Sequence, residues 1–319
     1  MRRIKNKKGF IEFGWIFALI VGALVLFFAF YFIGTKMTES KVGQGLVSEN
    51  TLDILLNPFS SFGGLGATSS KEINLAKRER INLSCNADSG FGYDYILSAT
   101  NNVKMVPKKV YDKYIFSENS IYSKNLQVIS KPFNMPWRTV DLIYLFSRDK
   151  AYCFVGMSSS ATYEEFGPGN TGMNISSFKF VDDEMWCDKL LDDITVCSSG
   201  CDINIDYQNS RVVKSGKEFP FVDDASMYAA IFSSYEIYEC NMKRVAQRIR
   251  FEIEVYRNKA RSLGAKGCTA VFNLESLDQS ATQVIQSRTS SELGSSLSSL
   301  RAAADSLSMQ NMNSDCSLF

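Results

Sequence analysis

Residues 13–33 form an uncharged run of 21 residues, FGWIFALIVGALVLFFAFYFI, and no other feature of the sequence limits the fold so strongly. At about 1.5 Å per residue, a helix of this length covers the roughly 30 Å hydrocarbon core of a bilayer. Trp15 and Tyr31 stand near its two ends, where aromatic rings favour the membrane interface. The run therefore predicts a transmembrane helix over residues 13–34.

The flanking charges predict the orientation of this helix. Lys36 and Lys41 follow it together with Glu39. The basic residues that precede it are Arg2, Arg3, Lys5, Lys7 and Lys8. This asymmetry places residues 1–12 in the cytoplasm and the rest of the chain outside, in a single-pass protein of the plasma membrane. A cleaved secretory signal is the alternative, but the run is longer than a signal core and no small-x-small motif follows it.

The N-terminal motif resembles a known family. Lys7-Lys8-Gly9-Phe10, followed by Glu12 and the apolar run, is similar to the start of type IV pilins and their archaeal relatives. The resemblance covers about the first 35 residues and implies cleavage by a peptidase between Gly9 and Phe10. The whole chain also resembles uncharacterised single-pass surface proteins of some small-genome archaea, which implies membrane location but no known activity.

The remaining composition is that of a globular protein. Of the 319 residues, 45% are hydrophobic and 22% are charged, and the net charge is +1. A chain without a charge excess offers no general attraction for nucleic acid, so we expect no nucleic-acid partner. Motifs that bind a nucleotide or another cofactor are missing from the sequence, and we expect none bound.

The cysteine count is even. The eight are Cys85, Cys153, Cys187, Cys197, Cys201, Cys240, Cys268 and Cys316. In an exported domain this count favours disulfides over free thiols or a zinc cluster, for which the nearest spacing is Cys197-x-x-x-Cys201. A continuous helix would separate Cys240 from Cys268 by roughly 35 Å, so these two should not pair, and we favour Cys240 with Cys316.

The chain beyond the apolar run divides into three parts. Residues 35–70 are expected to be a stem and a flexible linker, because glycine and serine accumulate there. Residues 71–221 alternate short β-branched and aromatic runs with turn residues, which predicts a mixed α/β domain. Examples of the expected strands are residues 95–97, 127–129, 142–146, 152–155 and 178–181, with a hairpin turning at 208–210.

Residues 222–319 have helical periodicity. Apolar residues recur at spacings of three and four from Tyr238 to Leu263, with Gly264 and Gly267 ending the pattern, and a second stripe runs from Leu293 to Leu307. Two antiparallel helices packed along these stripes are the simplest arrangement. The expected fold class is α+β, with one transmembrane helix, a mixed α/β ectodomain and a C-terminal helical hairpin.

One cluster of basic residues offers a candidate binding surface. Its members are Lys243, Arg244, Arg248, Arg250, Arg257, Lys259 and Arg261. At helical spacing they could bind an anionic polymer, lipid head groups or an acidic partner. The alternative, which we favour, is a solvated face in which Glu252 and Glu254 provide partial pairing.

Three weaker motifs complete the survey. Asn82 and Asn174 each begin an Asn-x-Ser triplet that fits the glycosylation pattern. Residues 132–137, PFNMPW, suit either an exposed recognition loop or a loop packed on the core, and we expect the latter. Residues 202–206, DINID, begin like a calcium loop but lack its later ligands, so we expect a strand.

The chain contains no histidine, which removes the commonest general base and the partner of triad nucleophiles. We therefore expect a non-enzymatic surface protein that binds other proteins or assembles with itself, with residues 13–34 in contact with membrane lipid. A receptor for a small solute or glycan is the alternative, and a cleft that combines aromatic and polar side chains would favour it. An enzyme based on carboxylates, or on serine with lysine, is the third hypothesis.

Overall fold

The computed structural model describes residues 20–28, 30, 69–88, 90–99, 107–150, 152–155, 178–181, 203–268 and 270–319. The chain divides into two units, residues 1–47 and 48–319. Several predicted segments lie outside the described residues, namely the basic segment 1–12, most of the linker 35–70 and the connection between residues 155 and 178.

The predicted transmembrane helix over residues 13–34 is corrected by the structure. Within the described part of the chain, no helix combines the length and the apolar character that crossing a bilayer requires. The single-pass topology and the external location inferred from the predicted helix are not upheld.

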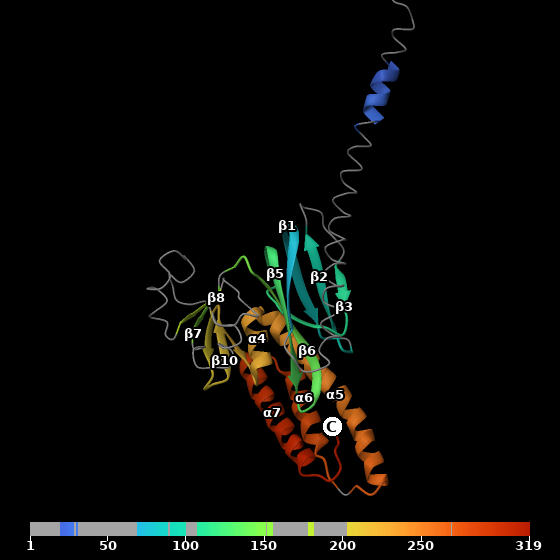
Figure 1. Ribbon diagram of the computed structural model, residues 1–319, viewed down its shortest axis with the longest axis vertical. Coiled ribbons are helices and arrows are strands. Elements are labelled where there is room, and N and C mark those ends of the chain that lie inside the picture. Colours follow the sequence, from blue (N-terminus) through green and yellow to red (C-terminus); the bar gives the residue numbers. More distant parts are fainter. Residues whose placement is uncertain are drawn as a thin grey trace, which may run out of the picture. The chain divides into compact units, whose positions relative to one another are not determined.

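A six-stranded sheet forms the first layer of the second unit (Figure 1), in the order β3-β2-β1-β5-β6-β4. Its strands are β1 (Ser69–Asn86), β2 (Tyr93–Ala99), β3 (Lys108–Val110), β4 (Tyr114–Ser117), β5 (Ser120–Asn134) and β6 (Arg138–Ser147). All neighbours are antiparallel except β4 and β6, which run parallel. The predicted strands 95–97, 127–129 and 142–146 are confirmed within β2, β5 and β6.

A second sheet has five strands in the order β11-β10-β9-β7-β8. Its strands are β7 (Tyr152–Val155), β8 (Phe178–Val181), β9 (Ile203–Asp206), β10 (Arg211–Lys214) and β11 (Lys217–Pro220). β7 is parallel to β8 and β9, whereas β9, β10 and β11 form an antiparallel meander. The predicted hairpin is confirmed, because residues 207–210 turn between β9 and β10.

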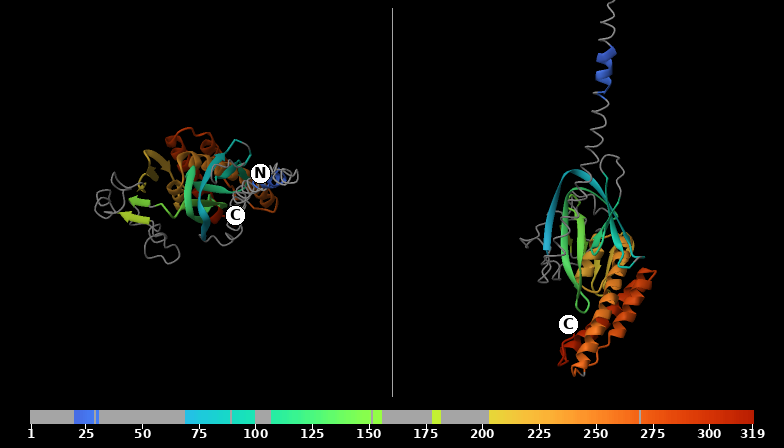
Figure 2. Two further views of the ribbon diagram at one scale, coloured as in Figure 1. Left: turned by 90° about the horizontal axis from the view of Figure 1, so that it is seen from above. Right: turned by 90° about the vertical axis from the view of Figure 1, so that its right-hand side faces the viewer.

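Four helices follow in sequence: α4 (Asp224–Phe232), α5 (Tyr235–Ala265), α6 (Leu274–Gln286) and α7 (Ser290–Met312). The side chains of Asp223, Asn273 and Thr289 cap α4, α6 and α7 by accepting a backbone N–H from the first turn. The expected two-helix hairpin is wrong, since α6 packs against both α5 and α7 (Figure 2). α6 therefore takes the place beside α5 that was expected for the helix at residues 293–307. Its buried apolar residues are Leu274, Leu277, Ala281 and Val284.

The larger of two apolar clusters joins both sheets to the helices. Aromatic rings dominate it, with Phe146 stacked on Phe232 at a centroid distance of 4.1 Å and Tyr144 edge-on to Tyr228. Residues 132–137 pack on this core as expected, although residues 132–134 belong to β5. Within this segment, the ring centroid of Trp137 lies 4.0 Å from that of Tyr256. The core therefore fixes α4 and α5 on the sheets, and their junction forms the wall of the site described next.

Candidate functional site

A cavity of about 450 Å³ lies between the second sheet and the junction of α4 with α5. We call it the lysine cleft. Its lining residues are Glu118, Lys150, Tyr152, Ile203, Lys214, Ser215, Lys217, Phe219, Ile231, Ser234, Tyr235 and Glu236. They come from the turn after β4, the start of β7 and the residues before it, the start of β9, the β10–β11 hairpin, the end of α4 and the start of α5. The volume falls in the range of about 300–1,000 Å³ that small-molecule sites occupy.

Each of the three lysines in the lysine cleft lies over an aromatic ring. The Nζ atoms of Lys150, Lys214 and Lys217 are 5.3, 5.1 and 5.3 Å from the ring centroids of Tyr152, Phe219 and Tyr235, respectively. An ammonium over the face of a ring is attracted by the negative charge of that face. The three rings therefore hold the lysine side chains along the wall of the cavity.

Lys214 is fixed by the end of α4. Its Nζ donates to the carbonyl oxygens of Ile231 at 2.7 Å and Ser233 at 2.6 Å, with Ala230 more distant at 3.4 Å. The last carbonyls of a helix have no partner within the helix and carry its negative end. Lys214 neutralises that end, so its role within the cleft is structural.

Lys150 and Lys217 form the ion pairs of the cleft. Lys150 Nζ lies 2.6 Å from Glu118 Oε1, and Lys217 Nζ lies 2.7 Å from Glu236 Oε1. The hydrogen bond from Lys217 is the main cause that lowers the pKa of Glu236. Side-chain exposures of 53% for Lys217 and 58% for Glu236 show that this pair is in contact with solvent. Exposed pairs are weak and rearrange at little cost, so a ligand can reach both groups.

The seven basic residues singled out in the sequence do not share one surface. Five of them have an acidic partner: Lys243 with Glu239, Arg244 with Asp94, Arg248 with Glu252, Arg250 with Asp278, and Arg257 with Glu254, Glu275 and Asp278. Arg261 donates to Asn258, and Lys259 is exposed. This pairing agrees with a solvated face for the exposed members, whereas Arg244 belongs to the interior.

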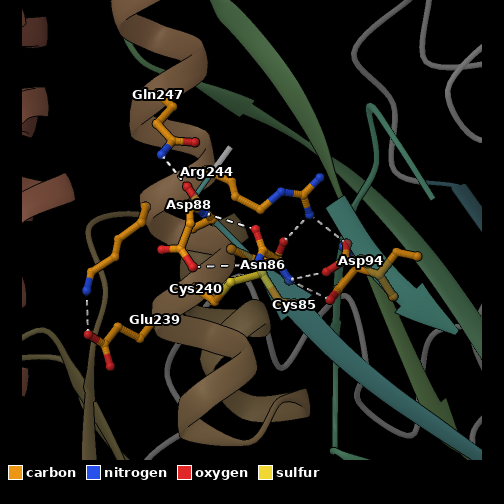
Figure 3. Close-up of a disulfide and its surroundings, with 12 residues drawn as sticks. Cys85, Asn86, Asp88, Asp94, Glu239, Cys240, Arg244 and Gln247 are labelled. Atoms are coloured by element: carbon orange, nitrogen blue, oxygen red, sulfur yellow. Dashed lines mark hydrogen bonds and ion pairs between the residues drawn. A yellow bond between two sulfur atoms is a disulfide. The ribbon is translucent and has the colours of Figure 1, made fainter. Parts of the chain in front are cut away.

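Arg244 is completely buried against Asp94, whose side chain is 1% exposed (Figure 3). Its Nη1 donates to Asp94 Oδ2 at 2.8 Å and to Asn241 Oδ1 at 2.7 Å. The backbone N–H of Ile115 also donates to Asp94. Burial raises the pKa of the Asp94 carboxyl, and the charge of Arg244 opposes that shift. Within the described part of the chain, the buried Nη2 of Arg244 has no hydrogen-bond partner. The carboxylate of Asp94 is fully engaged by Arg244, Asn241 and Ile115, so the pair is structural and leaves no carboxylate free for chemistry.

The described disulfides join distant parts of the chain. Cys85 pairs with Cys240 and Cys268 pairs with Cys316, each at a Cα separation of 6.0 Å. The expected exclusion of a Cys240–Cys268 pair is confirmed, but the favoured Cys240–Cys316 pair is wrong. Cys153 is also disulfide-bonded. Three further cysteines lie outside the described residues: Cys187, Cys197 and Cys201.

The other sequence motifs carry no described site. Asn82 lies within β1, half-buried, whereas Asn174 and the candidate processing site at Gly9 and Phe10 lie outside the described residues. Asp206, expected to lie in a strand, ends β9 and accepts hydrogen bonds from Asn209 in the turn. Among the residues that the structure describes, no group of three metal-binding side chains occurs.

Sequence reasoning missed the lysine cleft because its walls come from residues 118 to 236. One local signal existed: Lys217 and Phe219 stand two apart in β11, on the same face of the strand. Sequence spacing could not show that Ile231 in α4 and Tyr235 in α5 line the same cavity. Comparison with known proteins adds no relative, since no family model, curated protein or solved structure matches the chain.

Proposed function

We propose that this chain is a binding protein that holds a small solute in the lysine cleft. The observation that carries the proposal is the cavity of about 450 Å³ whose apolar floor lies beside three charged lysines. Small-molecule sites combine a mostly apolar wall with a few fixed polar groups that orient the ligand. This combination of aromatic and polar side chains favours the receptor hypothesis over an assembly role.

The residues of the cleft suit binding rather than catalysis. The lysines donate to carboxylate and carbonyl oxygens, which hold each ammonium in a fixed position beside the cavity. The chain also supplies no histidine as an alternative base. We therefore propose a reversible complex in which the solute leaves unchanged.

A thermal-shift screen tests this function. The full chain is heated with metabolite-sized carboxylates, phosphates, amino acids and monosaccharides, and at least one class is expected to raise the unfolding temperature. The shift should be lost in Tyr235→Ala, which removes a wall of the lysine cleft. Tyr122→Ala is the matched control, because Tyr122 is 60% exposed on β5 and does not line the cleft.

Two results would contradict the proposal. One is a screen in which no class of solute stabilises the chain. The other is a solute whose stabilisation survives in Tyr235→Ala, since that solute would bind elsewhere.

A further inference from the structure

The charges of the lysine cleft do not cancel. Three ammonium groups face two carboxylates, those of Glu118 and Glu236. The cleft also contains the N-terminus of α5, where Ser234 is the N-cap, and the first N–H groups of a helix carry a partial positive charge. The opposing negative end of α4 is already bonded to Lys214. The remaining field within the cleft is therefore positive.

Two of the lysines retain capacity for a ligand. An ammonium has three N–H donors, and the carboxylate of Glu118 takes one from Lys150 while that of Glu236 takes one from Lys217. An incoming oxyanion can therefore bind either lysine without displacing its glutamate. Charge-assisted hydrogen bonds of this kind are about twice as strong as neutral ones.

The floor of the cleft is apolar. Tyr152, Ile203, Phe219 and Ile231 line it, and each is at most 4% exposed. These apolar side chains can pack against a ring or an aliphatic group of a ligand. A bare inorganic ion would leave this floor uncovered, whereas a ring attached to the anionic group would cover it.

We propose that the solute is an oxyanion, a carboxylate or a phosphate, attached to a ring or another compact apolar body. Lys150 and Lys217 bind the anionic group, and the aromatic floor packs against the body. This inference rests on the proposed function and adds the chemical class of the ligand.

Calorimetric titration of the full chain with a matched set of probes tests the inference. The probes are benzoate, phenyl phosphate, benzyl alcohol, benzylammonium and inorganic phosphate. Benzoate or phenyl phosphate is expected to bind at least about tenfold more tightly than the alcohol, the cation and the inorganic ion. Comparing the two aromatic anions distinguishes a carboxylate site from a phosphate site.

Variants test the assigned residues. Lys217→Met keeps an unbranched apolar side chain, one atom shorter, and removes the charge. Affinity for the aromatic anion should therefore fall about tenfold, while that for benzyl alcohol stays unchanged. Lys150→Met should behave in the same way. Lys243→Met is the control, because Lys243 pairs with Glu239 outside the cleft and its loss should change neither affinity.

The outcomes separate the two proposals. If benzyl alcohol or benzylammonium binds as tightly as the aromatic anions, or more tightly, the claim that the ligand carries an oxyanion is overturned. The proposal that the cleft binds a solute would still stand. If inorganic phosphate binds as tightly as phenyl phosphate, the claim that the ligand carries an apolar body is overturned. Unchanged anion affinity in both lysine variants overturns the assigned contacts. If none of the probes binds and the solute screen is also negative, both proposals fail.

Discussion

Asp94 lies directly opposite Cys85 across the β1–β2 pair. Their partners on α5 are Arg244 and Cys240, which stand one helical turn apart. The two strands are thus fastened to α5 by a covalent link and an ion pair side by side (Figure 3). Because α5 also begins at the lysine cleft, these links stabilise the element that forms one wall of the proposed site.

Removing Arg244 should destabilise the fold strongly. Arg244→Met leaves the carboxylate of Asp94 buried without its cation, a change that costs about 3–5 kcal/mol of unfolding free energy. The double variant Asp94→Asn/Arg244→Met should be more stable than Arg244→Met alone, because the uncompensated charge is gone. Urea unfolding of the four proteins measures this coupling.

The control for this cycle is Arg250→Met. Arg250 is 46% exposed and pairs with Asp278, so its loss should cost less than about 1 kcal/mol. Equal losses for Arg244→Met and Arg250→Met would show that the buried pair does not hold α5.

Gly92 should not tolerate a side chain. Its φ is +63°, and a Cβ atom there would overlap the carbonyl oxygen of Asn86 and lie 2.9 Å from Arg244 Nε. Gly90 also has a positive φ, of +55°, but a Cβ there would meet open space. Gly90→Ala should therefore cost about 1–2 kcal/mol from backbone strain alone, whereas Gly92→Ala should cost more. Urea unfolding of both variants decides the matter, and equal costs would exclude the clash.

The Cys85–Cys240 and Cys268–Cys316 disulfides should contribute unequally to the free energy of unfolding. Cys85 and Cys240 are 155 residues apart, whereas Cys268 and Cys316 are 48 apart. Loop-closure entropy alone gives about 5 kcal/mol for the longer loop and about 4 kcal/mol for the shorter one. Replacing each pair by alanines and measuring urea unfolding should show the larger loss for Cys85–Cys240. A larger loss for the Cys268–Cys316 pair would contradict the loop-length explanation.

Acid stability should depend on Asp149, the carboxylate that accepts hydrogen bonds from Ser123 and Lys124 within β5. The backbone N–H of Lys124 is the main cause that lowers the pKa of Asp149 from 3.8 to about 2. A depressed pKa in the folded state means that the carboxylate stabilises the fold fully above pH 3.8 and loses that effect as the pH falls to about 2. The stability difference between the unaltered chain and Asp149→Asn should therefore shrink over this interval. A difference that is constant from pH 5 to pH 2 would contradict the lowered pKa.

The local sequence pattern predicted several of the strands and helices but not which of them pack against one another. The apolar run at residues 142–146 and the helical periodicity from Tyr238 to Leu263 were sufficient to place β6 and α5. The stripe of α6 is short and interrupted by polar residues, which is why it was missed. Arg244 looked like a surface cation because its partner Asp94 lies 150 residues upstream. The span predicted at residues 13–34 rested on the length and the apolar character of that run, and no helix in the described part of the chain combines the two.

The most direct test of solute binding is methyl NMR of the full chain labelled at isoleucine. Ile203 and Ile231 line the lysine cleft. Ile81, a residue of β1, lies in the smaller apolar cluster and does not line the cleft. Titration with phenyl phosphate or benzoate is expected to shift the methyl signals of Ile203 and Ile231 in a saturable way and to leave that of Ile81 in place. Saturable binding that moves neither cleft methyl would contradict the account.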